Sequence, residues 1–191
     1  MRRSTYQNPG LNPVWAIIGL NFMVLIFTMI NQRAAYSLLG LTPAYVSKQP
    51  WTLVTSLFIH GGFWHFFSNM LAFYFFGSYL QSLIGEKKLL MVYFGGGLLG
   101  SITFLLLASE FSTVVGASGA VFSVCGALAF LNPRLRVLVF FFLPLPLWAV
   151  IILGLVLISP GIAWQAHLGG LIFGLVAGYF FRRKLRQRYW W

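Results

Sequence analysis

The sequence predicts an all-α, polytopic membrane protein in which six transmembrane helices pack as one bundle. Apolar residues make up 59% of the 191 residues and charged residues only 8%, which leaves too little polar surface for a soluble globule. The apolar residues also gather into stretches close to the roughly 20 residues that a helix needs to cross a bilayer. About six such spans with short connections fit this length. We therefore expect a single membrane domain over residues 1–191, with no separate soluble domain.

Charged residues, prolines and glycines set the bounds of the six predicted spans. The spans lie at about 14–31, 62–83, 88–108, 115–132, 136–157 and 163–181. A long loop, about 32–61, follows the first span and contains the apolar stretch 51–59. That stretch is too short to cross roughly 30 Å of hydrocarbon as a helix. We expect a half-embedded element there, anchored at the outer interface by Trp51.

The distribution of lysines and arginines predicts the orientation of the chain. Eleven of the thirteen lie in the N-terminal segment, in the loops after spans two and four, and in the C-terminal tail. Arg33 and Lys48 lie on the other side. Because positively charged segments remain in the cytoplasm, both termini are predicted to be cytoplasmic. We expect an integral protein of the plasma (inner) membrane.

The same bias accounts for most of the net charge of +11, so nucleic-acid binding is not expected. The tail, residues 182–191, mixes cations with aromatic side chains. This composition predicts contact with anionic lipid at the cytoplasmic surface. Cys125 is the single cysteine, which excludes an internal disulfide, and its apolar neighbours mark it as a core residue.

Four polar side chains share one depth in the predicted membrane. Spans two, four and six all run inward from the outer face in this topology. The polar residues, each within the first two turns of its span, are His65, Asn69, Ser118 and His167. Polar groups are costly in hydrocarbon, so a set at one level indicates a water-accessible functional site near the outer face.

Ser118 and His167 have the residue types of a nucleophile and its general base. A serine hydroxyl becomes a good nucleophile when a neighbouring base takes its proton, and neutral imidazole is such a base near pH 7. The chain contains no aspartate, and its two carboxylates, Glu86 and Glu110, fall in predicted loops. Serine chemistry would therefore use a Ser-His pair without an acidic third member.

The same set of residues offers donors for the oxyanion that such an attack creates. These donors are the backbone N–H of Ser118, the amide of Asn69 and the ring of His65. Asn69 and His65 are four residues apart, so they occupy one face of span two. Phe122 lies one turn deeper than Ser118, and either it holds the His167 ring by stacking or it is ordinary core.

Small residues form matching rows on spans four and six. Span six carries His167, Gly170, Gly174 and Gly178 on one stripe, and span four carries Gly119, Ser123 and Gly126 in a similar row. Small residues let membrane helices approach closely. The rows therefore predict direct contact between the two spans, which would bring Ser118 within hydrogen-bond reach of His167.

Three separated motifs stand at or near the outer ends of spans two, four and six. They are His60-x4-His65-x3-Asn69, Gly-Ala-Ser-Gly at 116–119, and Ala166-His167 followed by Gly170. Together they resemble the rhomboid intramembrane serine proteases, and the resemblance covers essentially the whole chain. It implies a six-helix rhomboid-like bundle in which Ser118 and His167 cleave transmembrane segments near their outer ends. It also implies that His65 and Asn69 form the oxyanion hole and that His60 lines a hydrated cavity.

Two positions depart from the pattern of that family. Many members have Trp-Arg in the first loop where this chain has Trp51-Thr52, so an arginine that would brace the loop is missing and a looser loop is expected. Members often have tyrosine at the position of Phe122. The phenylalanine removes a hydroxyl but keeps the aromatic face.

Two other classes of protein fit parts of the pattern. A small transporter also places polar groups at one depth, although the inner halves of spans four and six offer no continuous polar track. A noncatalytic binder of membrane proteins would keep its function without the Ser118 hydroxyl. Metal-dependent and aspartyl proteases are excluded because the chain has neither a His-Glu-x-x-His motif nor an aspartate. We expect no cofactor and no metal, with transmembrane protein substrates and membrane lipid as partners.

Span five is the expected entrance for a transmembrane substrate. Its aromatic residues and prolines are Phe140 to Phe142, Pro144, Pro146 and Trp148, and we expect this segment to form a mobile wall. Ser159-Pro160-Gly161 is expected to begin a cap over the dyad. A substrate must expose extended backbone, so we expect small residues at the cut and a helix-weakening Gly or Pro nearby.

Overall fold

The computed structural model describes residues 11–139, 142–158 and 163–188. Its α-helices are α1 (Pro13–Ile30), α2 (Gln32–Leu39), α3 (Thr52–Thr55), α4 (Phe63–Ala72), α5 (Ser78–Ile84), α6 (Glu86–Leu107), α7 (Ser118–Leu131), α8 (Leu147–Leu153) and α9 (Trp164–Arg188). Short 3₁₀ turns lie at Pro43–Tyr45 and Ser56–Phe58, and π-helical turns at Phe73–Gly77 and Gly154–Ile158. The predicted cap at 159–161 and the last aromatic residues of the tail, 189–191, lie outside the described residues.

The helices confirm the prediction of an all-α membrane protein. Within the described residues, three helices are long and apolar enough to cross a membrane, over Pro13–Ile30, Glu86–Leu107 and Trp164–Arg183. Shorter apolar helices lie at Ser118–Leu131 and Leu147–Val156. α4 and α5 follow each other directly through the π-helical turn between them. The count of six spans in one domain stays a prediction.

The predicted fifth span is wrong in its first half. We predicted a helix over 136–157, whereas an antiparallel hairpin of β1 (Arg136–Val139) and β2 (Leu143–Pro146) precedes α8. Proline lacks the N–H that a helix interior needs and disfavours the helical conformation in the residue before it. Pro144 and Pro146 therefore keep this segment extended, and α8 begins directly after Pro146. These two predicted wall residues lie in the hairpin, and Phe140 and Phe141 lie outside the described part of the chain.

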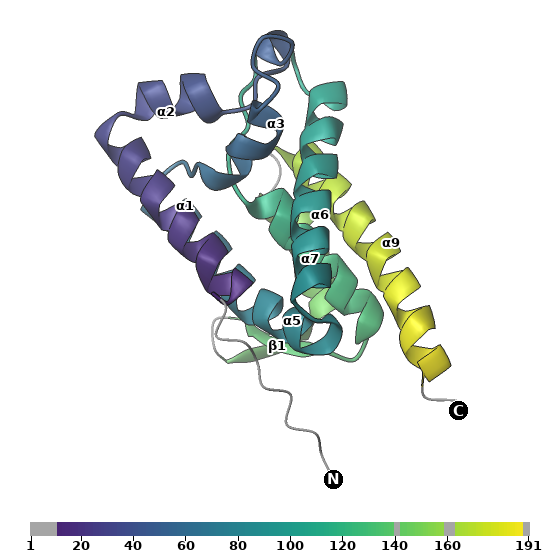
Figure 1. Cartoon of the computed structure of the whole chain (residues 1–191). Coiled ribbons are helices and arrows are strands. Elements are labelled where there is room, and N and C mark those ends of the chain that lie inside the picture. The colour runs from purple at the N-terminus through teal and green to yellow at the C-terminus, as the bar shows by residue number, and fades with distance from the viewer. Residues whose placement is uncertain (1–10, 140–141, 159–162, 189–191) are drawn as a thin grey trace.

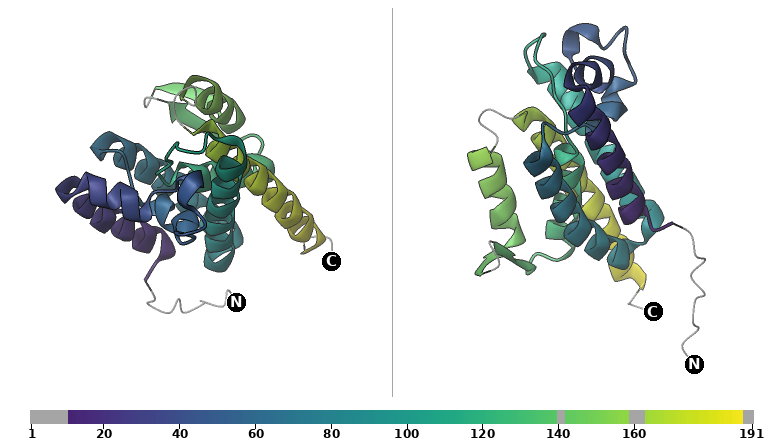
Figure 2. Two further views of the ribbon diagram at one scale, coloured as in Figure 1. Left: turned by 90° about the horizontal axis from the view of Figure 1, so that it is seen from above. Right: turned by 90° about the vertical axis from the view of Figure 1, so that its left-hand side faces the viewer.

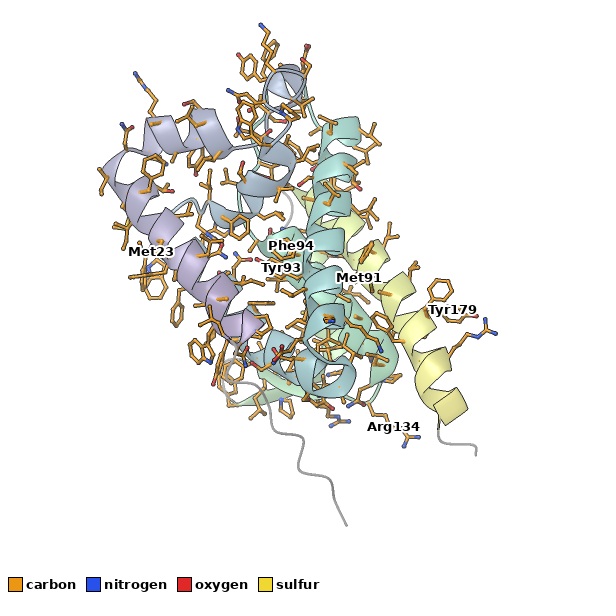
Figure 3. The ribbon with its side chains drawn as sticks, in the orientation of Figure 1. Met23, Met91, Tyr93, Phe94, Arg134 and Tyr179 are labelled. Carbon is orange, nitrogen blue, oxygen red and sulfur yellow. The ribbon has the colours of Figure 1, made fainter. Side chains whose placement is uncertain are left out.

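The long first loop and the hairpin lie at opposite ends of the molecule. Figure 1 shows α2 and α3 at one end, and the start of α1 and the end of α9 at the other, beside β1. Arg134 lies at the end that carries the hairpin (Figure 3). α8 stands at an edge of the bundle, on the side away from α1 (Figure 2).

Glycines let α9 lie directly against α7. A Cβ on Gly170 would overlap the carbonyl oxygen of Gly119, and one on Gly174 would overlap that of Ser123. Ser123 in turn reaches the third helix of this group, since its Oγ donates a 2.9 Å hydrogen bond to the carbonyl of Val92 in α6. The predicted close contact between the small-residue rows is therefore present.

Candidate active site

Ser118 is the first residue of α7 and follows a tightly held turn. Gly116 has φ +125°, a conformation that residues with a Cβ rarely adopt. Its N–H donates to the carbonyl of Ser56 at 2.9 Å. The turn leaves the Ser118 side chain half-buried at the start of the helix, where backbone N–H groups have no partner within the helix. The free N–H groups at such a helix start can donate hydrogen bonds to a developing oxyanion.

His167 lies near the start of α9 and is 3% exposed. Its Nε2 lies 2.8 Å from the Ser118 Oγ. The two residues come from helices far apart in the chain, and the contact between Gly119 and Gly170 holds these helix ends together. Because a neutral imidazole accepts only on its unprotonated nitrogen, His167 can take the serine proton at Nε2 when the ring carries its own proton on Nδ1.

Phe122 stacks on the His167 ring. The ring centroids are 4.6 Å apart and the planes differ by 16°. Of the two roles open at the sequence level, stacking is the one that the geometry provides. A flat aromatic contact fixes the plane of an imidazole, which in other serine enzymes is the task of a buried carboxylate.

His65 lies in the first turn of α4, with its ring beside the turn that precedes Ser118. Its Nδ1 accepts a 3.1 Å hydrogen bond from the N–H of Gly61. A Cβ on Gly116 would lie 2.9 Å from the His65 Nε2 and 3.7 Å from the Ser118 Oγ. The His65 Nε2 edge and the Ser118 hydroxyl therefore border one small space that the glycine keeps open.

Asn69 lies one turn below His65 and is 7% exposed. Its Nδ2 donates a 2.8 Å hydrogen bond to the carbonyl of His65, which uses one of its two N–H groups. The structure places the amide on the same helix face as His65. If Asn69 donates to an oxyanion, it must do so through the second N–H of its amide.

His60 is fully buried behind His65. Its ring meets His65 edge-on at 5.1 Å and Phe66 edge-on at 5.6 Å. Burial, with a smaller effect from His65, lowers the pKa of His60 to about 3, so its ring is neutral at ordinary pH. The His60 ring thus packs against that of His65, and its place beside a hydrated cavity stays a prediction.

Hydrogen bonds brace the first loop, although it lacks the arginine that many family members have there. Trp51 Nε1 donates to the carbonyl of Leu38 at 2.8 Å, and Thr55 Oγ1 donates to that of Leu39 at 2.9 Å. Thr52 is 1% exposed, and its Oγ1 donates to the carbonyl of Gln49 at 2.6 Å. These bonds brace the loop from within, and a loop looser than in members that have the arginine stays a prediction.

Sequence reasoning missed the contacts that join the first loop to the turn before Ser118. Leu41 and Val114 exchange backbone hydrogen bonds of 3.1 and 2.9 Å. Next to them, Thr42 Oγ1 and Thr113 Oγ1 lie 2.7 Å apart. Such pairing between distant loops leaves no local pattern in the sequence. The first loop therefore helps to hold the segment that carries the serine.

Comparison with known proteins identifies the family. The model of the Rhomboid domain matches residues 47–184. The chain belongs to the rhomboid family. The matched range includes all the residues around the dyad, which are His60, His65, Asn69, Ser118, Phe122 and His167, and leaves α1 and α2 outside it.

Several rhomboid proteins are similar to this chain along most of its length. "Rhomboid protein 1, mitochondrial" of Saccharomyces cerevisiae is 29% identical, over 93% of this chain and 56% of that protein. "RHOMBOID-like protein 12, mitochondrial" of Arabidopsis thaliana is 28% identical, over 89% of this chain and 54% of that protein. "Rhomboid protease GluP" of Bacillus subtilis is 31% identical, over 91% of this chain and 36% of that protein. The chain thus spans about half the length of the first two relatives.

Proposed function

We propose that this rhomboid protein is an intramembrane serine endopeptidase that cleaves transmembrane segments of membrane proteins near their outer ends. The observation that carries the proposal is the distance of 2.8 Å between the Ser118 Oγ and the His167 Nε2. A hydroxyl and an imidazole at this distance form a nucleophile with its general base. The protease name of one relative, GluP, supports the same reaction class.

The reaction begins when His167 takes the proton of Ser118 while the Oγ attacks the scissile carbonyl. The carbonyl oxygen becomes an oxyanion, and the Ser118 backbone N–H, the His65 ring and the Asn69 amide donate to it. His167 then gives its proton to the leaving amine. Water next attacks the acyl-serine with His167 again as base, which releases the second product and restores the serine. Phe122 keeps the His167 plane fixed through both halves.

Substrate enters sideways past α8. This helix stands at an edge of the bundle (Figure 2) and continues into the π-helical turn that begins at Gly154. A Cβ on Gly154 would lie 3.2 Å from the Phe122 ring, so this turn packs on the residue that supports the base. The proline-containing hairpin at its cytoplasmic end separates α8 from α7 and serves as the hinge. Cross-linking α8 to α4 should therefore abolish cleavage of membrane substrates.

Membrane lipid is the second predicted partner. Lys88 lies over the ring of Phe181 at 5.3 Å, and Arg182 lies over that of Phe130 at 5.9 Å. Lys88 and Arg182 are thus positioned by aromatic rings at the hairpin end of the bundle, where they can bind anionic lipid headgroups. The plasma membrane remains our predicted location, with both termini in the cytoplasm and the site toward the outer face.

The proposal is tested by labelling the purified protein in detergent with a fluorophosphonate, which reacts with activated serines. Wild-type protein should be labelled, whereas Ser118→Ala and His167→Ala should not. Ser82→Ala removes an exposed serine in α5 and is the matched control that should keep full labelling. Folded wild-type protein without any label would instead favour a noncatalytic binder or a small transporter.

A further inference from the structure

We propose that the backbone N–H of Gly61 is a positioning group that holds His65 in the tautomer with its proton on Nε2, facing Ser118. The inference deepens the proposed function, because a donor on Nε2 is what an oxyanion beside Ser118 requires. It concerns the state of one ring in the resting protein, so it is measurable without any substrate.

The His65 Nδ1 accepts a hydrogen bond from the backbone. The Gly61 N–H is a donor and cannot accept, and it lies 3.1 Å from the His65 Nδ1. A proton on Nδ1 would therefore place two donors against each other, both in the other neutral tautomer and in the imidazolium. Only the neutral ring with its proton on Nε2 leaves Nδ1 free to accept the hydrogen bond from the Gly61 N–H.

The Nε2 of His65 points toward the turn before Ser118. A Cβ on Gly116 would lie 2.8 Å from the His65 Cε1 and 2.9 Å from its Nε2, with the Ser118 Oγ 3.7 Å from the same point. The Nε2 edge of the ring therefore faces the turn that presents the nucleophile. A proton on this atom is a donor on the side where the attacked carbonyl oxygen develops charge.

The two histidines need their protons on different nitrogens. His167 must leave Nε2 unprotonated to accept from Ser118, so its neutral ring carries the proton on Nδ1. His65 must carry it on Nε2. The site thus needs opposite tautomers in two neighbouring imidazoles, and the chain has no aspartate to set either one. For His65, a backbone amide takes that role.

The chain around Gly61 fits this role. Gly62 has φ +137°, and this turn starts α4 at Phe63 so that His65 folds back over the Gly61 N–H. A Cβ on Gly61 would lie 3.2 Å from the Tyr36 hydroxyl and 3.6 Å from the His65 Nδ1. On its other side, the His65 ring meets His60 edge-on at 5.1 Å. The ring is therefore held between a backbone donor and a buried aromatic neighbour.

The direct test is nitrogen NMR of the imidazoles in the full-length protein in detergent. The chain has three histidines, so labelling histidine with ¹⁵N gives few signals, and His65→Gln assigns one ring by its loss. We expect His65 with Nε2 protonated and Nδ1 bare, and His167 with the reverse. The same His65 state is expected in Ser118→Ala. A His65 proton on Nδ1, or an equal mixture of tautomers, would overturn the inference.

A pair of variants tests the role of the amide itself. Gly61→Pro removes the N–H, whereas Gly61→Ala keeps it, and both are made with Tyr36→Phe so that the hydroxyl leaves room. We expect the alanine variant to keep the tautomer. The proline variant should mix the tautomers and lower kcat in proportion to the fraction of rings that lose the proton on Nε2, about twofold for an equal mixture, with little change in KM. An unchanged tautomer in the folded proline variant would contradict the role.

A second pair covers the case in which the proline variant does not fold. The amide nitrogen of His65→Gln reaches about as far as Nε2, whereas that of His65→Asn reaches only about as far as Nδ1. Cleavage by the glutamine variant should exceed that by the asparagine variant at least about tenfold, since only glutamine restores a donor there. Equal cleavage would overturn the inference. If the wild-type protein cleaves nothing, the proposed function fails, while the NMR result still decides the tautomer.

Discussion

Replacing Gly170 by alanine should slow the reaction of Ser118 about a hundredfold without touching either catalytic group. The new Cβ would lie 2.7 Å from the carbonyl carbon of Gly119 and 3.1 Å from its Cα, whereas ordinary contacts begin at 3.4 Å. Both partners belong to helix backbone, so neither can rotate away. The helices α7 and α9 must therefore separate by about 1 Å at the level of the site.

That separation acts on the distance between Ser118 and His167. It would grow from 2.8 Å to about 3.8 Å, beyond the range of a hydrogen bond. A misplacement of about 1 Å typically costs about 10² in rate. The rate of fluorophosphonate labelling measures this loss directly, and the melting temperature in detergent shows whether the variant is folded.

Gly19→Ala is the matched control. Gly19 lies in α1, and a Cβ there would meet nothing within 4 Å, so the labelling rate should equal that of the wild type. A folded Gly170→Ala protein that is labelled at the wild-type rate would refute the reasoning. It would mean that the contact between α7 and α9 does not set the position of His167.

Three further predictions address the residues around the dyad. Phe122→Leu should lower kcat up to about tenfold, because an aromatic pair contributes about 0.5–1.5 kcal/mol, whereas Phe122→Tyr should keep the rate; equal kcat values for the two would argue against stacking. Gly116→Ala should abolish labelling, because its Cβ would lie 2.8 Å from the His65 ring at a φ of +125°; retained labelling would show that the turn is adaptable. Trp51→Phe should lower the free energy of unfolding by about 1 kcal/mol through loss of the bond to Leu38, measured by denaturation in detergent, and Trp148→Phe, on the exposed side of α8, should not.

The parts of the site that follow from local rules could be predicted from the sequence. Hydropathy and charge placed Ser118 and His167 at the starts of two helices, and the rows of small residues indicated that these helices touch. The structure has both helix starts and the contact between them. The stacking of Phe122 followed from its position one turn below the serine, although the sequence left its role open.

The parts that the sequence did not predict depend on backbone geometry and on pairing between distant segments. Hydropathy alone made 136–146 the start of a span, because the apolar residues there masked the effect of Pro144 and Pro146 on the backbone. The bond between Thr42 and Thr113 joins loops far apart in the chain. The Gly61 N–H is a backbone group, and its partner became visible only once the turn at Gly62 was known.

The most direct test of the proposed protease is cleavage of a transmembrane substrate in liposomes that contain the purified protein, with mass spectrometry to locate the cut. The substrate should carry small residues and a glycine near the outer end of its span. Wild-type protein should cut once in that region, and Ser118→Ala should cut nowhere. Cleavage that continues in Ser118→Ala, or none by a wild-type protein that fluorophosphonate labels, would contradict the account.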